Sequence, residues 1–354
     1  MRRSVYFAGN DTFKQHVIPF FRGAGLEETT RKKDADILYV TFGGHYGPLA
    51  HPISWYGKQN MVFHWIGSDV LRWQEGIRSK NIIKRLYYRL WRRLMLRKHR
   101  RKQLISLAVT EHLQDKLSSI GIPAEVFPIT SIHEDTIRMA EEMDAGSAAK
   151  EARQGDAEAG KREAKTGKGE AERSKTGKKD RHAAASSGEA YRATDVIGYI
   201  PMDDFDFYGG PLFASLAERL PQRRFTVVVP DRREVSDEER AQFPGNVRVL
   251  PELSFEAMQQ ELASSRCMFR ATRHDGLSLL VLEALLHEIH VLWSQPFPHT
   301  YHVDPELTAP EELAARVEHL IAMKEKNTEG KRFVIERYRT DRLQREFEKL
   351  FSGF

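Results

Sequence analysis

Along this chain, short runs of apolar residues alternate with segments in which apolar residues recur at the helical period. The apolar runs predict strands, and the periodic segments predict helices. In the first third, short apolar runs predict strands at 3–9, 35–44, 60–67, 103–110 and 124–129. Helical spacing follows at 11–25 and 111–121, with Asp11 as an N-cap and Gly25 at a helix end.

The same alternation resumes after residue 192. Strands are expected at 193–200, 223–230, 246–251, 266–272 and 289–294, and helices at 211–220, 254–264, 278–288, 310–325 and 339–351. Alternating strands and helices predict an α/β protein with two doubly wound, Rossmann-like parallel sheets. Ligands bind such sheets beyond the carboxyl ends of the strands, so a site is expected in a cleft between two facing domains.

Between these parts the composition changes. Residues 142–190 are mostly Ala, Gly, Lys, Glu, Arg and Ser, and Met143 is their one large apolar side chain. Such a stretch cannot bury enough surface to offset the entropy of ordering it. The sequence therefore predicts four parts: a Rossmann-like domain (1–135), a disordered linker (136–191), a second Rossmann-like domain (192–335) and a last helical segment (336–354).

The net charge of +5 comes from one segment. Ten Lys and Arg residues and no acid lie between Lys84 and Lys102, and the rest of the chain is net negative. A local basic element is predicted rather than a general polyanion-binding surface, so nucleic acid is not an expected partner. With a single cysteine, Cys267, and neither a signal peptide nor an apolar run of about 18 residues, we expect a cytoplasmic protein.

Residues 81–103 form the basic element and show helical periodicity. One face carries Ile83, Tyr87, Leu90 and Leu94, widened by Leu86 and Trp91, and the opposite face carries Lys84, Arg85, Arg89, Arg92 and Arg93. Two interpretations stay open. The apolar face packs on the N-terminal domain, or residues 82–102 bind an anionic membrane surface, which would place the protein peripherally on the inner membrane face.

The stretch "ATRHDGLSLLVLEALLHE" (271–288) is mostly apolar but holds two carboxylates, Asp275 and Glu283. It predicts a strand end, a glycine turn and a helix beginning near Ser278. The first amides of a helix have no internal partners and carry partial positive charge, which suits a phosphate. The two carboxylates can accept hydrogen bonds from sugar hydroxyls.

This stretch resembles the signature of retaining glycosyltransferases with the GT-B architecture, most closely family four. In that family a Glu, seven residues and a second Glu stand in "PS-x-x-EGFGL-x-x-x-EA", and Asp275 here takes the place of the first Glu. Four further segments are similar in order and spacing to those of the family: "HWIGSDV", "ISLAVTEHLQDKLSSIGIPAEVFPI", "NVRVLPELSFEAMQQELASSRCMFRAT" and "YRTDRLQREFEKLF".

The resemblance implies a nucleotide-sugar donor, retention of anomeric configuration and no metal. It makes 1–135 the acceptor-side domain, 192–335 the donor-binding domain and 336–354 a helix that crosses back to the N-terminal domain. It places the ribose on Glu283 and the transferred sugar against Asp275. Other expected donor-binding residues are Gly276, Leu277, Ser278, Arg273, His274 and Glu252. Together with the basic element, it suggests a lipid-linked or glycan acceptor.

On the acceptor side, the resemblance points to the ends of the N-terminal strands. His64 and Asp69 in "FHWIGSDV" are candidate catalytic residues, although His64 lies two positions before the family's histidine. Candidate acceptor contacts follow the first and second predicted strands: Gly9, Asn10, Gly43, Gly44 and His45. No Cys and His cluster has the spacing of a metal site.

One departure concerns the diphosphate. The family carries an Arg and a Lys in "GR-x-x-x-x-KG", but Tyr199 and Tyr208 stand there in "IGYIPMDDFDFYGG", with Asp203, Asp204 and Asp206 between them. Acids oppose a diphosphate. Three alternatives follow: Arg270, Arg273 or a residue across the cleft supplies the charge; the donor is unusual; or the protein is an inactive scaffold that partners an active enzyme.

Overall fold

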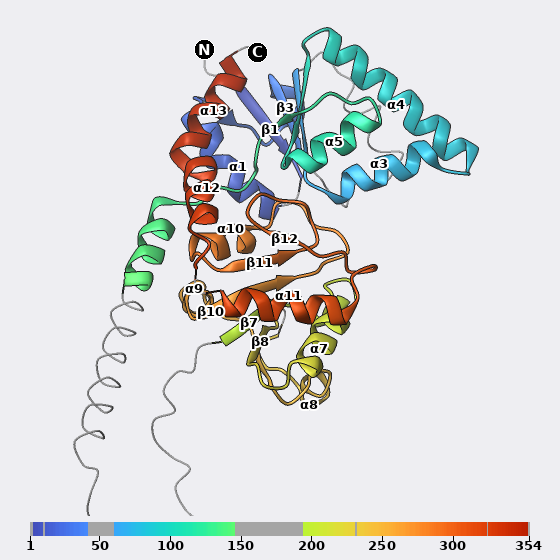
Figure 1. Cartoon of the computed structure of the whole chain (residues 1–354). Helices are drawn as coiled ribbons and strands as arrows, with labels where there is room; N and C mark the ends of the chain where they lie inside the picture. The colour runs from blue at the N-terminus through green and yellow to red at the C-terminus, as the bar shows by residue number, and fades with distance from the viewer. Residues whose placement is uncertain are drawn as a thin grey trace, which may run out of the picture.

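The computed structural model describes residues 3–9, 11–41, 60–145, 194–230, 232–323 and 325–352. Within these residues, the chain forms two α/β domains, each built on a six-stranded sheet with parallel pairing throughout. Figure 1 shows the domains one above the other, with helices packed around each sheet. The predicted fold class is confirmed.

The N-terminal sheet has the strand order β2-β1-β3-β4-β5-β6. Its strands are β1 (Ser4–Ala8), β2 (Glu27–Glu28), β3 (Ile37–Thr41), β4 (Asn60–Trp65), β5 (Leu104–Ala108) and β6 (Glu125–Val126). Its helices are α1 (Asp11–Gly23), η1 (Lys32–Asp34), α3 (Ser68–Arg78), α4 (Ile82–Arg100) and α5 (Glu111–Ser119). β3 is buried at every position, as expected for a central parallel strand covered on both faces.

The C-terminal sheet has the order β12-β11-β10-β7-β8-β9. Its strands are β7 (Thr194–Tyr199), β8 (Phe225–Val228), β9 (Val247–Leu250), β10 (Ser265–Arg270), β11 (His290–Trp293) and β12 (Tyr301–His302). Its helices are η2 (Met202–Asp204), α7 (Gly210–Arg219), α8 (Asp237–Arg240), α9 (Phe255–Ala263), α10 (Leu279–Leu286), α11 (Pro310–Ala322) and α12 (Thr328–Tyr338). The winding reverses between β7 and β10, and ligands of doubly wound sheets bind at such a reversal.

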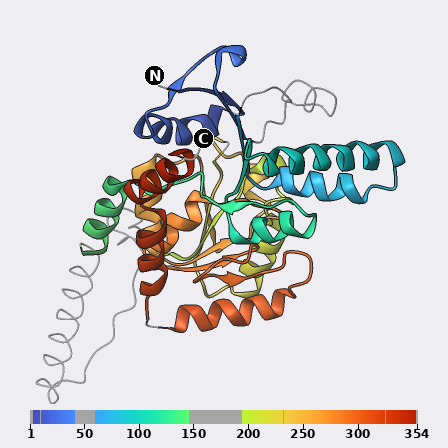
Figure 2. The same cartoon turned by 90° about the horizontal axis from the view of Figure 1, so that it is seen from above.

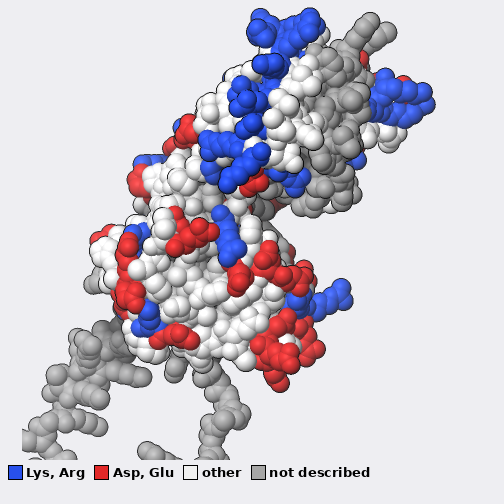
Figure 3. Space-filling view, turned by 90° about the vertical axis from the view of Figure 1, so that its right-hand side faces the viewer, with Lys and Arg blue, Asp and Glu red and all other residues white. Residues whose placement is uncertain are grey.

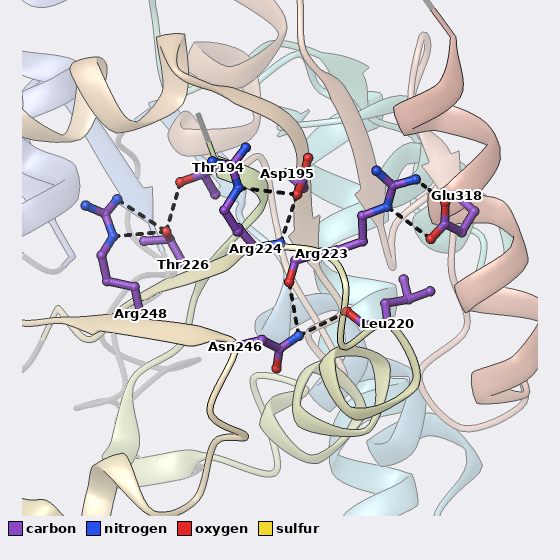
Figure 4. Close-up of polar contacts among 9 residues, drawn as sticks. All are labelled: Thr194, Asp195, Leu220, Arg223, Arg224, Thr226, Asn246, Arg248 and Glu318. Carbon is purple, nitrogen blue, oxygen red and sulfur yellow. Dashed lines mark hydrogen bonds and ion pairs between the residues drawn. The ribbon is translucent and has the colours of Figure 1, made fainter. Parts of the chain in front are cut away.

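The opposite, amino edge of this sheet is held by polar contacts (Figure 4). The Asn246 amide donates to the carbonyls of Ala217, Leu220 and Arg223 at 3.0–3.1 Å. The Arg224 backbone N–H donates to Asp195 at 2.8 Å. Asp195, Arg224 and Asn246 stand at or next to the beginnings of β7, β8 and β9, and Ala217 and Leu220 belong to the end of α7. The network therefore fixes the amino edge and leaves the carboxyl edge for a ligand.

The last helix, α13 (Thr340–Ser352), crosses back to the N-terminal domain (Figure 1). Leu343, Phe347 and Phe351 are at most 2% exposed and belong to the N-terminal core. The Phe347 ring centroid lies 5.6 Å from that of Phe20 on α1. The two domains are therefore joined by packing as well as by the chain between them.

A helix that the sequence did not predict stands where the disordered linker was expected to begin. Residues 134–145 are helical, and Ile137 and Ala140 are buried in a core shared with α10 and α12. The helix thus extends ten residues into the segment predicted to be disordered, and the burial of these two side chains holds it against the C-terminal domain.

The basic helix α4 pairs with α3, and the two project from the N-terminal domain (Figure 2). The apolar stripe is divided. Trp91 is buried and its ring lies 6.3 Å from that of Trp73 on α3, while Tyr87 and Leu94 are partly buried against the core. The other apolar side chains of the stripe, Ile83, Leu86 and Leu90, are 59–76% exposed, as is Ile82 at 60%. No helix within the described residues is long and apolar enough to cross a bilayer.

Candidate functional site

A cavity of about 360 Å³ opens at the carboxyl edge of the C-terminal sheet, at the reversal between β7 and β10. Tyr199 ends β7 and Arg270 ends β10, and both line it. Its other walls are Val228 and Pro230 at the end of β8, residues 252–255 after β9, Met258 on α9, and Ser278, Leu279, Leu280 and Glu283 around α10. Three predicted donor-binding residues, Glu252, Ser278 and Glu283, are thus brought together.

The beginning of α10 faces this cavity. Ser278 is the N-cap, and its hydroxyl accepts a hydrogen bond from the Val281 N–H at 3.4 Å. The next two residues, Leu279 and Leu280, line the cavity, and amides at these positions have no partner inside the helix. From Val281 onward the helix is buried. Packing therefore fixes the axis that aims the positive end of the helix at the cavity.

Glu283 lies one turn further into α10 and is 6% exposed. Burial raises the pKa of its carboxyl to about 7, and a side-chain contact with Gln259 opposes the rise by favouring the charged form. A carboxyl group with this pKa accepts hydrogen bonds fully only above neutral pH. Such perturbed groups in a cavity mark candidate functional sites.

Arg270 supplies a cation beside this carboxyl group. Its Nε lies 2.6 Å from Oδ2 of Asp275, and the two side chains are only 11% and 17% exposed. The second oxygen of Asp275 accepts the Gly276 N–H at 3.0 Å. Asp275 therefore stands next to the cavity through its pairing with Arg270.

The acids of the segment 202–208 do not line the cavity. Asp203, Asp204 and Asp206 are exposed, and Asp203 pairs with Arg232 at 2.6 Å. This segment is held against the loop after β10, because the Arg273 N–H donates to the Phe207 carbonyl at 2.9 Å. Arg273 itself is exposed and does not line the cavity.

The loop from His274 to Leu277 contacts the N-terminal domain. His274 lies against Gly67, and Gly276 lies against Ile66, at the turn between β4 and α3. Leu277 packs against both hydrophobic cores. These three predicted donor-binding residues therefore form part of the interface between the domains, beside the cavity.

The prediction that His64 is catalytic is not supported by its environment. The side chain is fully buried in the N-terminal core, where Nε2 lies 2.7 Å from the Phe127 carbonyl and Nδ1 lies 2.6 Å from the Tyr39 hydroxyl. A carbonyl only accepts, so Nε2 carries the hydrogen and Nδ1 accepts from Tyr39. Burial lowers the His64 pKa to about 4, so the ring is a neutral core residue.

Asp69 organises the β4–α3 turn. Its carboxylate accepts hydrogen bonds from the backbone N–H groups of Ile66, Gly67 and Val70 at 2.8–3.2 Å. Burial raises its pKa to about 6 against the opposing effect of these bonds. Asp69 thus holds the turn that meets His274 and Gly276, which is a positioning role rather than contact with the cavity.

Of the predicted acceptor-side residues, Asn10, Gly43, Gly44 and His45 lie outside the described residues. Gly9 follows β1 and approaches Thr41 at the end of β3 so closely that a Cβ would lie 1.8 Å from the Thr41 hydroxyl oxygen. The N-terminal sheet reverses its winding between these two strands. Gly9 therefore stands at the corresponding ligand-binding edge of the first domain.

Sequence reasoning missed several residues around the cavity, including Pro230, Ser254, Phe255 and Gln259. Only their position in the chain could have indicated them, because residues just beyond β8 and β9 reach the same edge of the sheet as the end of β10. Among the described residues, no group of three or more His, Cys, Asp or Glu side chains is arranged to hold a metal ion.

No protein-family model matches the sequence, and no curated protein sequence matches it. Solved structures do share its fold. HepE from Anabaena, determined in complex with UDP and glucose, superposes with a TM-score of 0.58 at 10% identity over the full length of both chains. A glycosyltransferase from Rickettsia africae gives a TM-score of 0.60 at 9% identity, also over both full chains.

Sucrose-phosphate synthase from Thermosynechococcus elongatus gives a TM-score of 0.58 at 10% identity, over 91% of this chain and 74% of that one. These neighbours are GT-B glycosyltransferases. The two-domain fold is therefore that of GT-B glycosyltransferases, and at these identities the likeness concerns the fold alone.

Proposed function

We propose that this protein is a glycosyltransferase that uses a nucleotide-sugar donor bound by its C-terminal domain. The observation that carries the proposal is the cavity at the reversal of the sheet, where the beginning of α10, the Glu283 carboxyl and the Arg270 guanidinium meet. A helix N-terminus and a guanidinium suit phosphates, and a carboxylate suits a ribose diol. UDP is the first nucleotide to test, because the neighbour HepE was solved with UDP and glucose.

In this proposal each part of the donor has its own contacts. The nucleobase lies against residues 252–255, and the ribose hydroxyls donate hydrogen bonds to Glu283. The diphosphate oxygens accept hydrogen bonds from the backbone N–H groups of Leu279 and Leu280. The sugar extends toward Asp275. The spacing of Asp275 and Glu283, which is similar to the Glu-x7-Glu signature of family four, is explained by these two contacts.

In this proposal Arg270 supplies the positive charge that the family obtains from its diphosphate-binding Arg and Lys. It is the cation that lines the cavity in the described part of the chain, and Asp275 already holds it there. A donor diphosphate offers Arg270 a second, more highly charged partner. When the guanidinium turns to the diphosphate, Asp275 is released toward the sugar, so one event stabilises the leaving group and frees the carboxylate.

The acceptor is proposed to enter from the N-terminal domain, past Gly9 and the segment that contains Asn10, Gly43, Gly44 and His45. Retention of configuration follows from the resemblance to family four. The product's anomeric proton coupling, measured by NMR, tests it: an inverted product would contradict the family assignment while leaving donor binding intact.

A lipid-borne acceptor is the finer part of the proposal. It is supported by α4, where exposed Ile83, Leu86 and Leu90 lie beside the exposed cations Lys84, Arg89, Arg93, Arg97 and Arg100. Figure 3 shows Lys and Arg side chains gathered over the projecting end of the N-terminal domain, whereas Asp and Glu are more frequent on the C-terminal domain. Apolar side chains flanked by cations suit an anionic bilayer surface.

Calorimetry with UDP and UDP-sugars tests the donor site. We expect Glu283→Gln and Arg270→Gln each to weaken UDP binding roughly 10- to 100-fold, since each removes a charge-assisted hydrogen bond worth about 1.5–3 kcal/mol. Arg270→Lys should recover part of the loss. The matched controls are Glu256→Gln and Arg266→Gln. Glu256 is an exposed residue of α9, and Arg266 is exposed at the other end of β10 from Arg270.

Two results would contradict the proposal. Binding of UDP that is unchanged in both Glu283→Gln and Arg270→Gln would place the nucleotide elsewhere. Absence of binding to any nucleotide or nucleotide sugar by the wild-type protein would remove the enzyme function.

A further inference from the structure

Three basic side chains that do not line the donor cavity come together at the interface between the domains. His112 and Lys116 belong to α5 of the N-terminal domain, and His274 belongs to the loop between β10 and α10 of the C-terminal domain. All three are partly buried. The two domains therefore share one basic group, which lies outside the site described above.

The two basic residues of α5 lie on one face of the helix. Positions four apart are neighbours on a helix, and both side chains are partly buried, whereas the acids of α5, Glu111 and Asp115, are exposed. α5 begins just after β5, and Figure 1 shows it on the side of its domain that faces the C-terminal domain. Helical side chains point back toward the amino end, so the long Lys116 side chain is directed toward this interface.

His274 meets the N-terminal domain from the opposite side. Its Nε2 is buried without a hydrogen-bond partner among the described residues, and a Cβ on Gly67, at the start of α3, would stand 2.9 Å from it. α3 lies beside α5, because the Gln74 side-chain amide donates to the Lys116 carbonyl at 3.2 Å. The imidazole is therefore placed at the amino end of α3, next to the helix that carries the other two basic groups.

These groups act on one another electrostatically. Burial lowers the pKa of His274, and the positive charge of Lys116 lowers it further. The pKa of His112 is lowered by burial and then by the charges of Lys116, His274 and His302, against an opposing effect of Asp115. Burial also lowers the pKa of Lys116. The basic groups of the two domains thus lie within electrostatic reach across the interface.

No carboxylate within the described residues compensates this basic group. Asp115 is exposed on α5, and Asp275, next to His274, is already paired with Arg270 at 2.6 Å. Asp69, in the turn that His274 contacts, accepts hydrogen bonds from backbone N–H groups. Burying charge without a counterion costs free energy, so this arrangement favours an anion that comes from outside the chain.

We propose that His112, Lys116 and His274 bind a phosphate group of the acceptor between the two domains. The proposal rests on the function proposed above and adds the chemical class of the acceptor, a phosphate ester carried by a sugar or by a lipid. Two of the three groups belong to the N-terminal domain, which assigns the site to the acceptor rather than to the donor. An ammonium and two imidazolium groups suit a phosphate because each donates a charge-assisted hydrogen bond.

Calorimetry with a hexose 6-phosphate and with a water-soluble, short-chain lipid phosphate tests the site. The unphosphorylated hexose is the control ligand and should not bind at this site. We expect Lys116→Gln to weaken binding of the phosphate ester roughly 10- to 100-fold, because it removes a hydrogen bond from a charged group. Lys116→Arg should restore most of the affinity. Binding of the hexose ester alone assigns a soluble acceptor, and binding of the lipid ester alone assigns a lipid-borne one.

The two histidines are tested by proton uptake, which a purely structural role would not produce. A bound phosphate favours the charged imidazoles, whereas burial and Lys116 favour the neutral ones in the free protein. Calorimetry in buffers of different ionisation enthalpy should therefore show proton uptake on binding, and affinity should rise as the pH falls from about 8.5 to 7. His112→Gln and His274→Gln should each lose part of this uptake, and the double variant should lose all of it.

The control variants are Lys84→Gln on α4 and His319→Gln on α11, both at exposed positions, and both should bind the hexose ester as the wild type does. Lys116→Gln should also keep the wild-type affinity for UDP. Absence of binding of both esters to the wild type, or wild-type ester affinity in Lys116→Gln, would overturn the proposal. If the ester binds as expected but the protein binds no UDP, the phosphate site stands and the proposed function is overturned.

Discussion

Gly276 of the C-terminal domain lies against Ile66 of the N-terminal domain so closely that a Cβ on Gly276 would stand 2.1 Å from the Ile66 carbonyl oxygen. The obstacle is backbone, which cannot turn away as a flexible side chain could. Gly276 directly follows Asp275, so the fit of the two domains and the position of the carboxylate proposed to face the sugar depend on the same turn.

Gly276→Ala is therefore expected to separate the domains at this point. The clash forces the turn after β10 away from Ile66, which should reduce glycosyl transfer far more than UDP binding, since the cavity lies within the C-terminal domain. Single-turnover rates and calorimetry on the same preparation measure both effects. Gly245→Ala is the matched control, because a Cβ there meets nothing within 4 Å. Equal losses in binding and turnover would show that the turn acts on the donor site as a whole.

Glu283→Gln should stabilise the free protein at alkaline pH. The pKa of Glu283 is raised from 4.5 to about 7, so the folded protein favours the neutral form, and this stability is lost as the pH rises from 4.5 through 7. A shift of this size corresponds to a cost on the order of 3 kcal/mol above pH 7. The variant should melt at a higher temperature than wild type at pH 8 and at a similar one at pH 4.5. A melting difference that does not change with pH would contradict the raised pKa.

Tyr39→Phe tests the role of His64. The substitution removes the hydroxyl that hydrogen bonds to buried Nδ1, leaving that nitrogen without its partner at a cost of about 1–3 kcal/mol. We expect a lower denaturant midpoint but an unchanged turnover rate per folded molecule. A drop in turnover without a loss of stability would instead return His64 to the catalytic residues.

The exposed side chains of α4 give a test of membrane binding. Ile83→Ser/Leu90→Ser should abolish co-sedimentation with anionic vesicles and leave melting nearly unchanged, because both side chains are more than half exposed. Arg89→Gln/Arg93→Gln should weaken binding chiefly at low salt. Trp91→Ala is the stability control, with an expected cost of about 3–5 kcal/mol. Vesicle binding by the double Ser variant equal to that of wild type would exclude this surface.

Residues 148–190 are expected to be dispensable for folding. They contain no large apolar side chain, so a Gly/Ser linker of about 15 residues should keep cooperative melting and the circular dichroism of both domains. The replacement leaves Asp144 and its helix intact. A broadened or two-step melting curve would show that this segment contributes to the fold.

Much of the fold could be predicted because buried parallel strands are continuous apolar runs that need no partner to be recognised. The weaker elements could not. β2 and β12 have two residues each and show no period, and α12 buries only Gly330, Val334 and Tyr338. On α4 the apolar side chains that pack on the domain and those that stay exposed follow the same helical spacing in the sequence. Which of them are buried depends on contacts with α3, such as that of Trp91 with Trp73, and no local pattern reveals these contacts.

The candidate site also has features that the local sequence predicts and features that it does not. The helix start at Ser278 is a local feature, and the structure has it where the sequence predicted it, at the carboxyl edge of the sheet. The pairing of Arg270 with Asp275 and the enclosure of His64 by Tyr39 and Phe127 depend on distant contacts. His64 in particular lies one residue before the end of β4, and its burial depends on Tyr39 of β3 and on Phe127, which follows β6.

The packing of α13 on the first domain has a consequence for synthesis. The N-terminal core includes Phe347 and Phe351, which leave the ribosome more than 200 residues after the last strand of that domain. At about 5–20 residues per second, the N-terminal sheet waits roughly 10–45 s after its last strand, β6, for this final cover, while the C-terminal sheet can already close. The domain translated first is thus expected to be the one completed last, and the Phe20 ring, which lacks its Phe347 contact until α13 is made, is expected to be a site of chaperone binding during that interval.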